Sequence, residues 1–172
     1  MNNDTATYLV LGNSTAAVGA VEALRRVDRE TPIVLVAREP AHTYSRPLIS
    51  HLLAGEVDEA RMDYRARDFY GRNGVDARLG VEALQIDTDA RTVRVADART
   101  GSAAGTIGFE TLLIATGGRP VLPPFEGRNA AGVFTFTGWD DANAVAAWLE
   151  KRPAAKAVVI GGGLIGIKAA EA

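Results

Sequence analysis

Two short apolar runs near the start of the chain predict its first strands. The run Tyr8–Leu11 ends at Gly12, and apolar residues then recur at helical spacing over residues 16–26. A polar connection leads to the second run, Ile33–Ala37. Short runs without charged residues are typical of parallel strands that are buried on both faces. The pattern therefore predicts a strand, a tight turn, a helix and a second parallel strand.

The rest of the chain alternates between short helical segments and strands. Helices are predicted at Leu48–Ala54, Asp63–Asn73 and Asp140–Glu150. Strands are predicted at Asp76–Leu79, Val81–Asp87, Thr92–Ala96, Thr106–Phe109, Thr111–Ala115 and Ala157–Ile160. Turn residues separate the four strands between 76 and 109, which we expect to form a small antiparallel meander before the buried strand at 111–115 rejoins the sheet.

The turn after the first strand carries a glycine pattern. Gly12, Ser14 and Ala17 occupy the three key positions of the dinucleotide-binding fingerprint G-x-G-x-x-G. The first glycine allows a sharp turn, a small second residue lets the backbone approach a pyrophosphate, and a small third residue lets helix and strand pack closely. Because Ser14 replaces the second glycine, the motif alone is weak. A plain strand, turn and helix without a nucleotide is the alternative.

Charged residues after the second strand are candidate ligands. In dinucleotide-binding units a carboxylate about 20 residues beyond the glycines hydrogen-bonds the ribose, and Glu39 is the candidate here. Its neighbour Arg38 could lie over an adenine ring or be solvated. Arg46, just before Pro47 at a helix start, could meet a phosphate or be a surface arginine. An exposed loop carboxylate is the alternative for Glu39.

Composition excludes several classes of function. The 172 residues are 47% hydrophobic and carry a net charge of −2, which gives no reason to expect nucleic acid or an anionic membrane as a partner. Neither a membrane span nor a signal peptide is evident, so a cytoplasmic location is expected. The sequence has no cysteine and two histidines, which excludes disulfides and redox thiols from this segment and makes a metal site unexpected.

A second, complete fingerprint lies near the end of the sequence. Gly161, Gly163 and Gly166 follow the strand predicted at 157–160 and precede a helical pattern. This fingerprint begins 149 residues after the first (161 minus 12), too far for another turn of one mononucleotide unit. Two nucleotide sites on two domains are the simplest account. A flavin in one and a nicotinamide in the other would allow hydride transfer between them.

Four motifs in this order resemble the FAD-dependent pyridine nucleotide oxidoreductases: Gly12–Ala17, Tyr44–Ser50, Leu113–Gly117 and Gly161–Gly166. That family includes rubredoxin and ferredoxin reductases, the large subunit of NADH-dependent nitrite reductase and disulfide reductases. The resemblance implies an α/β fold: a Rossmann-like, three-layer FAD/NAD(P)-binding domain with a small β-meander, plus the first strand and helix of a second nucleotide-binding domain. The implied division is an FAD domain at 1–118, a linker and crossover helix at 119–154, and the start of an NAD(P) domain at 155–172.

The resemblance also implies which residues contact the two cofactors. For FAD these are Gly12, Ser14, Thr15, Ala16, Ala17, Arg38, Glu39, Arg46, Pro47, Ala83, Ala115, Thr116 and Gly117. For NAD(P)H these are Gly161, Gly163, Leu164, Ile165 and Gly166. Ala83 would meet the adenine through its backbone. His51 stands where ferredoxin-reductase-like members usually carry a lysine, so the resemblance does not imply lysine-assisted stabilisation of reduced flavin.

The expected function is electron transfer from NAD(P)H through FAD to an external acceptor. Because this segment has no thiol, electrons should pass directly to a rubredoxin, a ferredoxin, a haem or siroheme partner, or dioxygen. No catalytic side chain is expected, since hydride transfer between stacked rings depends on positioning. A regulatory module without turnover is the alternative. We expect the 172-residue chain alone to bind FAD weakly and to lack turnover, with residues 156–172 poorly ordered or packed against another surface.

Overall fold

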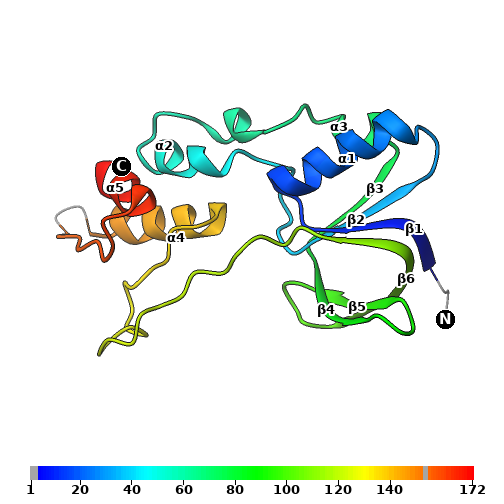
Figure 1. Ribbon diagram of the computed structural model, residues 1–172. Coiled ribbons are helices and arrows are strands. Elements are labelled where there is room, and N and C mark those ends of the chain that lie inside the picture. The colour runs from blue at the N-terminus through cyan, green and yellow to red at the C-terminus, as the bar shows by residue number, and fades with distance from the viewer. Residues whose placement is uncertain (1–3, 153–154) are drawn as a thin grey trace. The chain divides into compact units, whose positions relative to one another are not determined.

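The computed structural model describes residues 4–152 and 155–172. The chain divides into two compact units, one formed by Met1–Tyr44 and Tyr64–Gly117 and the other by Ser45–Asp63 and Gly118–Ala172. Figure 1 labels the elements of both units along the chain. Among the described residues, no helix is long and apolar enough to cross a membrane. The domain boundaries expected at 118 and 154 stay a prediction.

The first unit is built on a six-stranded sheet with the order β3-β2-β1-β6-β5-β4. The strands are β1 (Asp4–Leu11), β2 (Ile33–Ala37), β3 (Val75–Leu79), β4 (Val81–Asp87), β5 (Thr92–Asp97) and β6 (Ala103–Ile114). The pairs β3/β2, β2/β1 and β1/β6 are parallel, whereas β6/β5 and β5/β4 are antiparallel. The sheet is therefore mixed, with the expected meander at one side.

Two α-helices belong to the first unit and three to the second, among the described residues. The first unit contains α1 (Thr15–Val27) and α3 (Phe69–Arg72). The second unit contains α2 (Ile49–Leu53), α4 (Trp139–Glu150) and α5 (Leu164–Glu171), with short 3-10 turns at Arg46–Leu48 and Glu59–Met62. Within the second unit, α2 contacts both α4 and α5.

Both faces of the parallel strands in the first unit are covered. One face packs against α1 through Val10, Ile33, Leu35, Val18 and Val21. The other face packs against the meander through Leu9, Leu11, Val34, Val36, Val93 and Val95. Successive strand residues point to opposite faces, so a strand covered on both sides must be apolar throughout. These layers, visible in Figure 1 as α1, the sheet and the β4–β5 hairpin, confirm the expected three-layer architecture.

Four predicted elements of the first unit were wrong in detail. The strand expected in the antiparallel meander at 76–79 is β3, which pairs in parallel with β2 because Val75, Ala77 and Leu79 pack into the core beneath α1. The strands expected at 106–109 and 111–115 are one strand, β6. The helix expected at 63–73 is limited to α3, since the residues before it form tertiary hydrogen bonds such as Tyr64 N–H to the Thr43 carbonyl, at 2.9 Å.

The strand expected at 157–160 is also wrong. These residues form no regular element and are exposed, with Val158 at 87% and Ile160 at 65%. A strand needs a neighbour that pairs with its N–H and C=O groups, and no strand of the described residues pairs with this run. The helix predicted after it is present as α5.

The turn after α1 depends on the carboxylate of Asp28. Its Oδ1 accepts hydrogen bonds from the backbone N–H groups of Thr31, at 3.0 Å, and Glu30, at 3.1 Å, and its Oδ2 accepts one from the Tyr8 hydroxyl at 3.1 Å. These hydrogen bonds, that from the Thr31 N–H first among them, lower the pKa of Asp28 from 3.8 to about 2. The folded state therefore favours the ionised carboxylate.

This pKa shift predicts a loss of stability in acid. Asp28 stabilises the fold above pH ~4, and its contribution is lost as the pH falls toward its folded pKa of about 2. Asp28→Asn should weaken the turn at neutral pH and make the free energy of unfolding fall less steeply between pH 4 and pH 2 than in the wild type. Urea unfolding followed by circular dichroism measures both effects, with the exposed Asp68→Asn as control. Equal slopes for wild type and Asp28→Asn would contradict this role.

Candidate dinucleotide-binding site

The turn after β1 is a position that only glycine can occupy. Gly12 N–H donates to the Val36 carbonyl at 2.8 Å, and Ala115 N–H donates to the Leu11 carbonyl at 2.7 Å. Gly12 has a φ of +119°, and a Cβ there would lie 2.1 Å from the carbonyl oxygen of Ala115. Any side chain would therefore collide with backbone. The structure thus brings the first fingerprint against Ala115, the first residue of the predicted 115–117 turn.

The start of α1 is open to an anion. Ser14 precedes the helix, its carbonyl accepts the Val18 N–H at 3.0 Å, and its side chain forms no capping hydrogen bond. No acidic residue lies in the first turn, and Thr15 and Ala16 are exposed. The first N–H groups of a helix have no partner within the helix and carry the positive end of its dipole. Ala17, fully buried, is the small residue that lets α1 pack on the sheet.

Glu39 lies in the segment after β2 and is held in place. The Tyr44 hydroxyl donates to Glu39 Oε2 at 2.6 Å, and Gly80 N–H donates to the Glu39 carbonyl at 3.3 Å. Glu39 is half-buried, whereas Arg38 beside it is exposed. A partly buried carboxylate on a fixed loop suits the binding of ribose hydroxyls better than an unrestrained surface residue does.

The remaining predicted FAD contacts in the first unit lie on β4 and after β6. Ala83 is half-buried on β4, packs against the core between sheet and meander, and adjoins a bulge in the pairing with β5. Ala115 is half-buried against the core beneath α1, whereas Thr116 and Gly117 are exposed. The contacts of these residues with FAD stay a prediction.

Arg46 and Pro47 belong to the second unit. Pro47 lies in the first turn of a 3-10 helix, as expected for a proline at a helix start. Arg46 Nη1 donates to the carbonyl of Thr137 at 3.0 Å, so the guanidinium also holds the loop before α4. The carboxylate of Asp141 fixes the same loop by accepting the Thr137 N–H at 2.6 Å.

The second fingerprint forms a glycine turn followed by a helix. Gly161 has a φ of +121°, and a Cβ at Gly166 would lie 2.1 Å from the carbonyl oxygen of Gly161. Gly163 precedes α5, and its carbonyl accepts the Ile167 N–H at 3.0 Å. The first two residues of α5, Leu164 and Ile165, are exposed. As at Gly12, close backbone approach requires glycine.

The candidate binding residues chosen from the sequence did not include Asn13 and Tyr70, which form hydrogen bonds beside the first turn. The Tyr70 hydroxyl donates to Asn13 Oδ1 at 2.6 Å, and Asn13 Nδ2 donates to the Ala41 carbonyl at 3.1 Å. Asn13 occupies a variable position of the fingerprint, and Tyr70 lies 57 residues further along the chain. Their pairing depends on the tertiary fold, so no local pattern reveals it.

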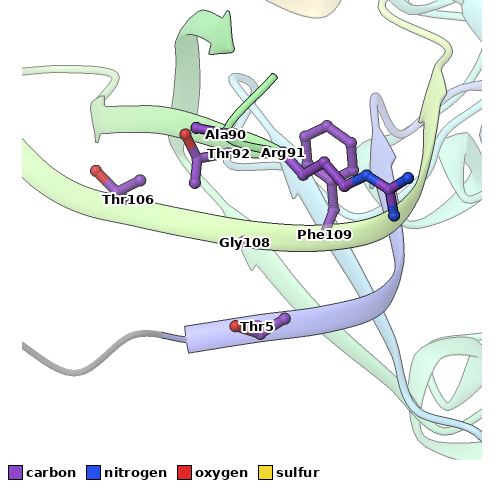
Figure 2. A pocket seen from close by; sticks show the side chains of 7 residues that line it. All are labelled: Thr5, Ala90, Arg91, Thr92, Thr106, Gly108 and Phe109. Atoms are coloured by element: carbon purple, nitrogen blue, oxygen red, sulfur yellow. The ribbon is translucent and has the colours of Figure 1, made fainter. Parts of the chain in front are cut away.

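A hollow of about 210 Å³ lies elsewhere in the first unit and is not part of this site. Figure 2 shows the residues that line it: Thr5, Ala90, Arg91, Thr92, Thr106, Gly108 and Phe109. Thr5 lies near the start of β1, whereas Gly12 follows its end. Within residues 4–152 and 155–172, no group of three or more His, Cys, Asp or Glu side chains could hold a metal ion.

A forced glycine turn, an uncapped helix start and a fixed carboxylate on a mixed sheet define a dinucleotide-binding α/β domain. Residues 6–172 match the family described as pyridine nucleotide-disulphide oxidoreductase, and the chain belongs to this family. The match confirms the family and the Rossmann-like fold expected from the sequence, together with its cofactors, FAD and NAD(P)H.

Named relatives cover nearly all of this chain. It is 32% identical to the NADH-dependent phenylglyoxylate dehydrogenase subunit epsilon of Aromatoleum evansii, over 95% of this chain and 37% of that protein. It is 31% identical to the assimilatory nitrate reductase electron transfer subunit of Bacillus subtilis, over 94% of this chain and 20% of that protein. The solved NAD-dependent persulfide reductase from A. fulgidus is 32% identical, with a TM-score of 0.82 over 95% of this chain and 31% of that one. The chain thus spans between 20% and 37% of these relatives' lengths.

Proposed function

We propose that the protein that carries this chain transfers electrons from NAD(P)H through FAD to an external acceptor. The observation that carries the proposal is the pair of glycine turns. A Cβ at Gly12, in the first turn, would lie 2.1 Å from the Ala115 carbonyl oxygen, and α1 follows that turn. A Cβ at Gly166, in the first turns of α5, would lie 2.1 Å from the carbonyl oxygen of Gly161 in the turn before that helix. Turns of this kind present backbone N–H groups to a pyrophosphate, so two of them support two dinucleotides.

The proposed contacts divide between the two cofactors by motif. In the first unit, Gly12–Ala17 would bind the FAD pyrophosphate and Glu39 the ribose, with Arg38, the backbone of Ala83 and the 115–117 turn as further contacts. Arg46 and Pro47 would lie along the same cofactor. The turn 161–166 would bind NAD(P)H. Hydride transfer between nicotinamide and flavin is the chemistry that the bound cofactors supply, and the protein's task is to hold them.

We infer that this chain does not pass electrons through sulfur. It has no cysteine, whereas disulfide reductases depend on a reactive thiol pair. A small electron-transfer protein or a redox domain is therefore the proposed acceptor. One relative, 32% identical over 94% of this chain, is the ferredoxin reductase component of a chlorobenzene dioxygenase from a Cupriavidus species, which agrees with such an acceptor. A cytoplasmic location is part of this proposal.

Anaerobic titration of the complete natural protein with NADH or NADPH tests the function. We expect the visible absorbance of oxidised flavin to disappear on titration and to return when oxidised rubredoxin or ferredoxin is added. If dioxygen reoxidises the flavin and neither rubredoxin nor ferredoxin does, the acceptor is dioxygen and the proposed protein acceptor is wrong. Nucleotide binding without loss of flavin absorbance would contradict turnover and favour a regulatory nucleotide-binding module.

A further inference from the structure

A hydrogen-bond network joins the two segments of the first unit that are proposed to bind pyrophosphate and ribose. The Tyr70 hydroxyl donates to Asn13 Oδ1 at 2.6 Å and accepts the backbone N–H of Thr43 at 3.1 Å. Asn13 Nδ2 donates to the carbonyl of Ala41 at 3.1 Å. Asn13 follows Gly12 directly, and residues 41–43 follow Glu39. The network therefore fastens the glycine turn to the segment that carries Glu39.

The ring of Tyr70 is fixed by aromatic neighbours. It meets the ring of Phe69 edge-on at 5.6 Å between centroids, and Phe69 is 2% exposed in the core beneath α1. It also meets the ring of His42 edge-on, at 4.8 Å between centroids. Edge-to-face contacts at these distances are favourable and restrict the ring. The hydroxyl is therefore presented to Asn13 from an immobilised position on α3.

The carboxylate of Glu39 is fastened to the same segment. The Tyr44 hydroxyl donates to Glu39 Oε2 at 2.6 Å, and Tyr44 is 6% exposed. Tyr44 is the next residue after Thr43, whose N–H donates to Tyr70. Asn13 is thus connected to the Glu39 carboxylate through Tyr70 and residues 43–44. Every link in this connection is a hydrogen bond or a peptide bond. The spacing between turn and carboxylate is set by the protein itself.

We propose that Asn13 and Tyr70 are positioning residues that preset this spacing for the ADP half of the dinucleotide. The inference rests on the proposed function, which places the pyrophosphate at the turn and the ribose at Glu39. If the segment 39–44 is already ordered before the ligand binds, binding does not have to order it. The entropic cost of binding is then smaller and the affinity is higher. Asn13 and Tyr70 thus act on the ligand through the residues that they hold.

Tyr70→Phe tests the proposal because it removes the hydroxyl and keeps the ring. In the complete natural protein, freed of flavin, we expect the Kd for FAD to rise about tenfold, which corresponds to ~1.4 kcal/mol. Quenching of FAD fluorescence measures this Kd. Competition by ADP, which lacks the flavin ring, should weaken by the same factor. Asn13→Ala removes the same hydrogen bond from the other side and gives a second test if Tyr70→Phe does not fold.

Tyr8→Phe is the matched control. The Tyr8 hydroxyl donates to Asp28 Oδ2 at 3.1 Å, in the turn at the far end of α1 from Ser14. The same chemical change there should lower the melting temperature and leave the Kd for FAD within about twofold of the wild type. If both variants shift the Kd equally, Tyr70 has only a structural role and the proposal fails.

A double-mutant cycle with Glu39→Ala separates positioning from stability. Without the carboxylate, Tyr70→Phe should raise the Kd for FAD by less than about threefold, because the residue that it positions is gone. A full tenfold effect in both backgrounds would overturn the proposal. Failure of the wild-type protein to bind FAD would refute the proposed function instead. FAD binding that neither Tyr70→Phe nor Asn13→Ala weakens would refute this inference alone.

Discussion

Gly12→Ala is expected to abolish FAD binding and to lower the free energy of unfolding by about 3 to 5 kcal/mol. The added Cβ would lie 2.1 Å from the carbonyl oxygen of Ala115, and the φ of +119° is one that alanine rarely adopts. Relief requires movement of β1 or of the turn after β6. Either movement breaks the hydrogen bonds from Gly12 N–H to Val36 or from Ala115 N–H to Leu11.

Gly19→Ala provides the matched control for this substitution. Gly19 lies within α1, and a Cβ there would meet no atom within 4 Å beyond its chain neighbours and the nearby backbone of its own helix. Alanine is a better helix former than glycine, so this variant should gain about 0.5 to 1 kcal/mol in stability and keep its FAD affinity. Urea unfolding followed by circular dichroism and FAD fluorescence titration measure the two properties. Unchanged stability and affinity in Gly12→Ala would show that the turn has another conformation in solution.

The parts of the fold that carry a local signal could be predicted from the sequence. The apolar runs at Tyr8–Leu11 and Ile33–Ala37 are buried on both faces, so burial itself removes polar residues from them. A Cβ at Gly166 would meet the carbonyl of Gly161 in the same motif, and a Cβ at Gly12 would meet the carbonyl of Ala115 in a distant segment. The fingerprint records both requirements. In these places the physical constraint and the sequence pattern coincide.

Features that depend on distant partners could not be predicted. The parallel pairing of β3 with β2 is decided by the core beneath α1, which the alternation of residues 75–79 alone does not identify. The run 157–160 has the composition of a strand, but no strand among the described residues pairs with it. Composition alone therefore predicted a strand that the structure does not contain. The Asn13–Tyr70 hydrogen bond joins residues that are brought together only by the tertiary fold. Cofactor contacts in both units stay predictions.

Arg25→Ala should lower the free energy of unfolding by about 2 to 4 kcal/mol without changing the binding site. The guanidinium of Arg25 joins the end of α1 to two loops by donating to four backbone carbonyls. These are the carbonyls of Asn73 at 2.6 Å, Thr31 at 2.9 Å, Asp28 at 3.0 Å and Gly74 at 3.3 Å. Without the arginine, several partly buried carbonyls lose a donor at once.

Two further variants and one binding measurement isolate the cause of this loss. Arg25→Lys should recover little stability, because an ammonium cannot reach four carbonyls in the geometry of a planar guanidinium. Arg26→Ala, at the exposed neighbour, should change the free energy of unfolding by less than about 0.5 kcal/mol. Below its melting temperature, Arg25→Ala should bind FAD as tightly as the wild type, because its contacts lie at the end of α1 opposite to Ser14. Equal losses in Arg25→Ala and Arg26→Ala would mean that the charge at the helix end matters and the four hydrogen bonds do not.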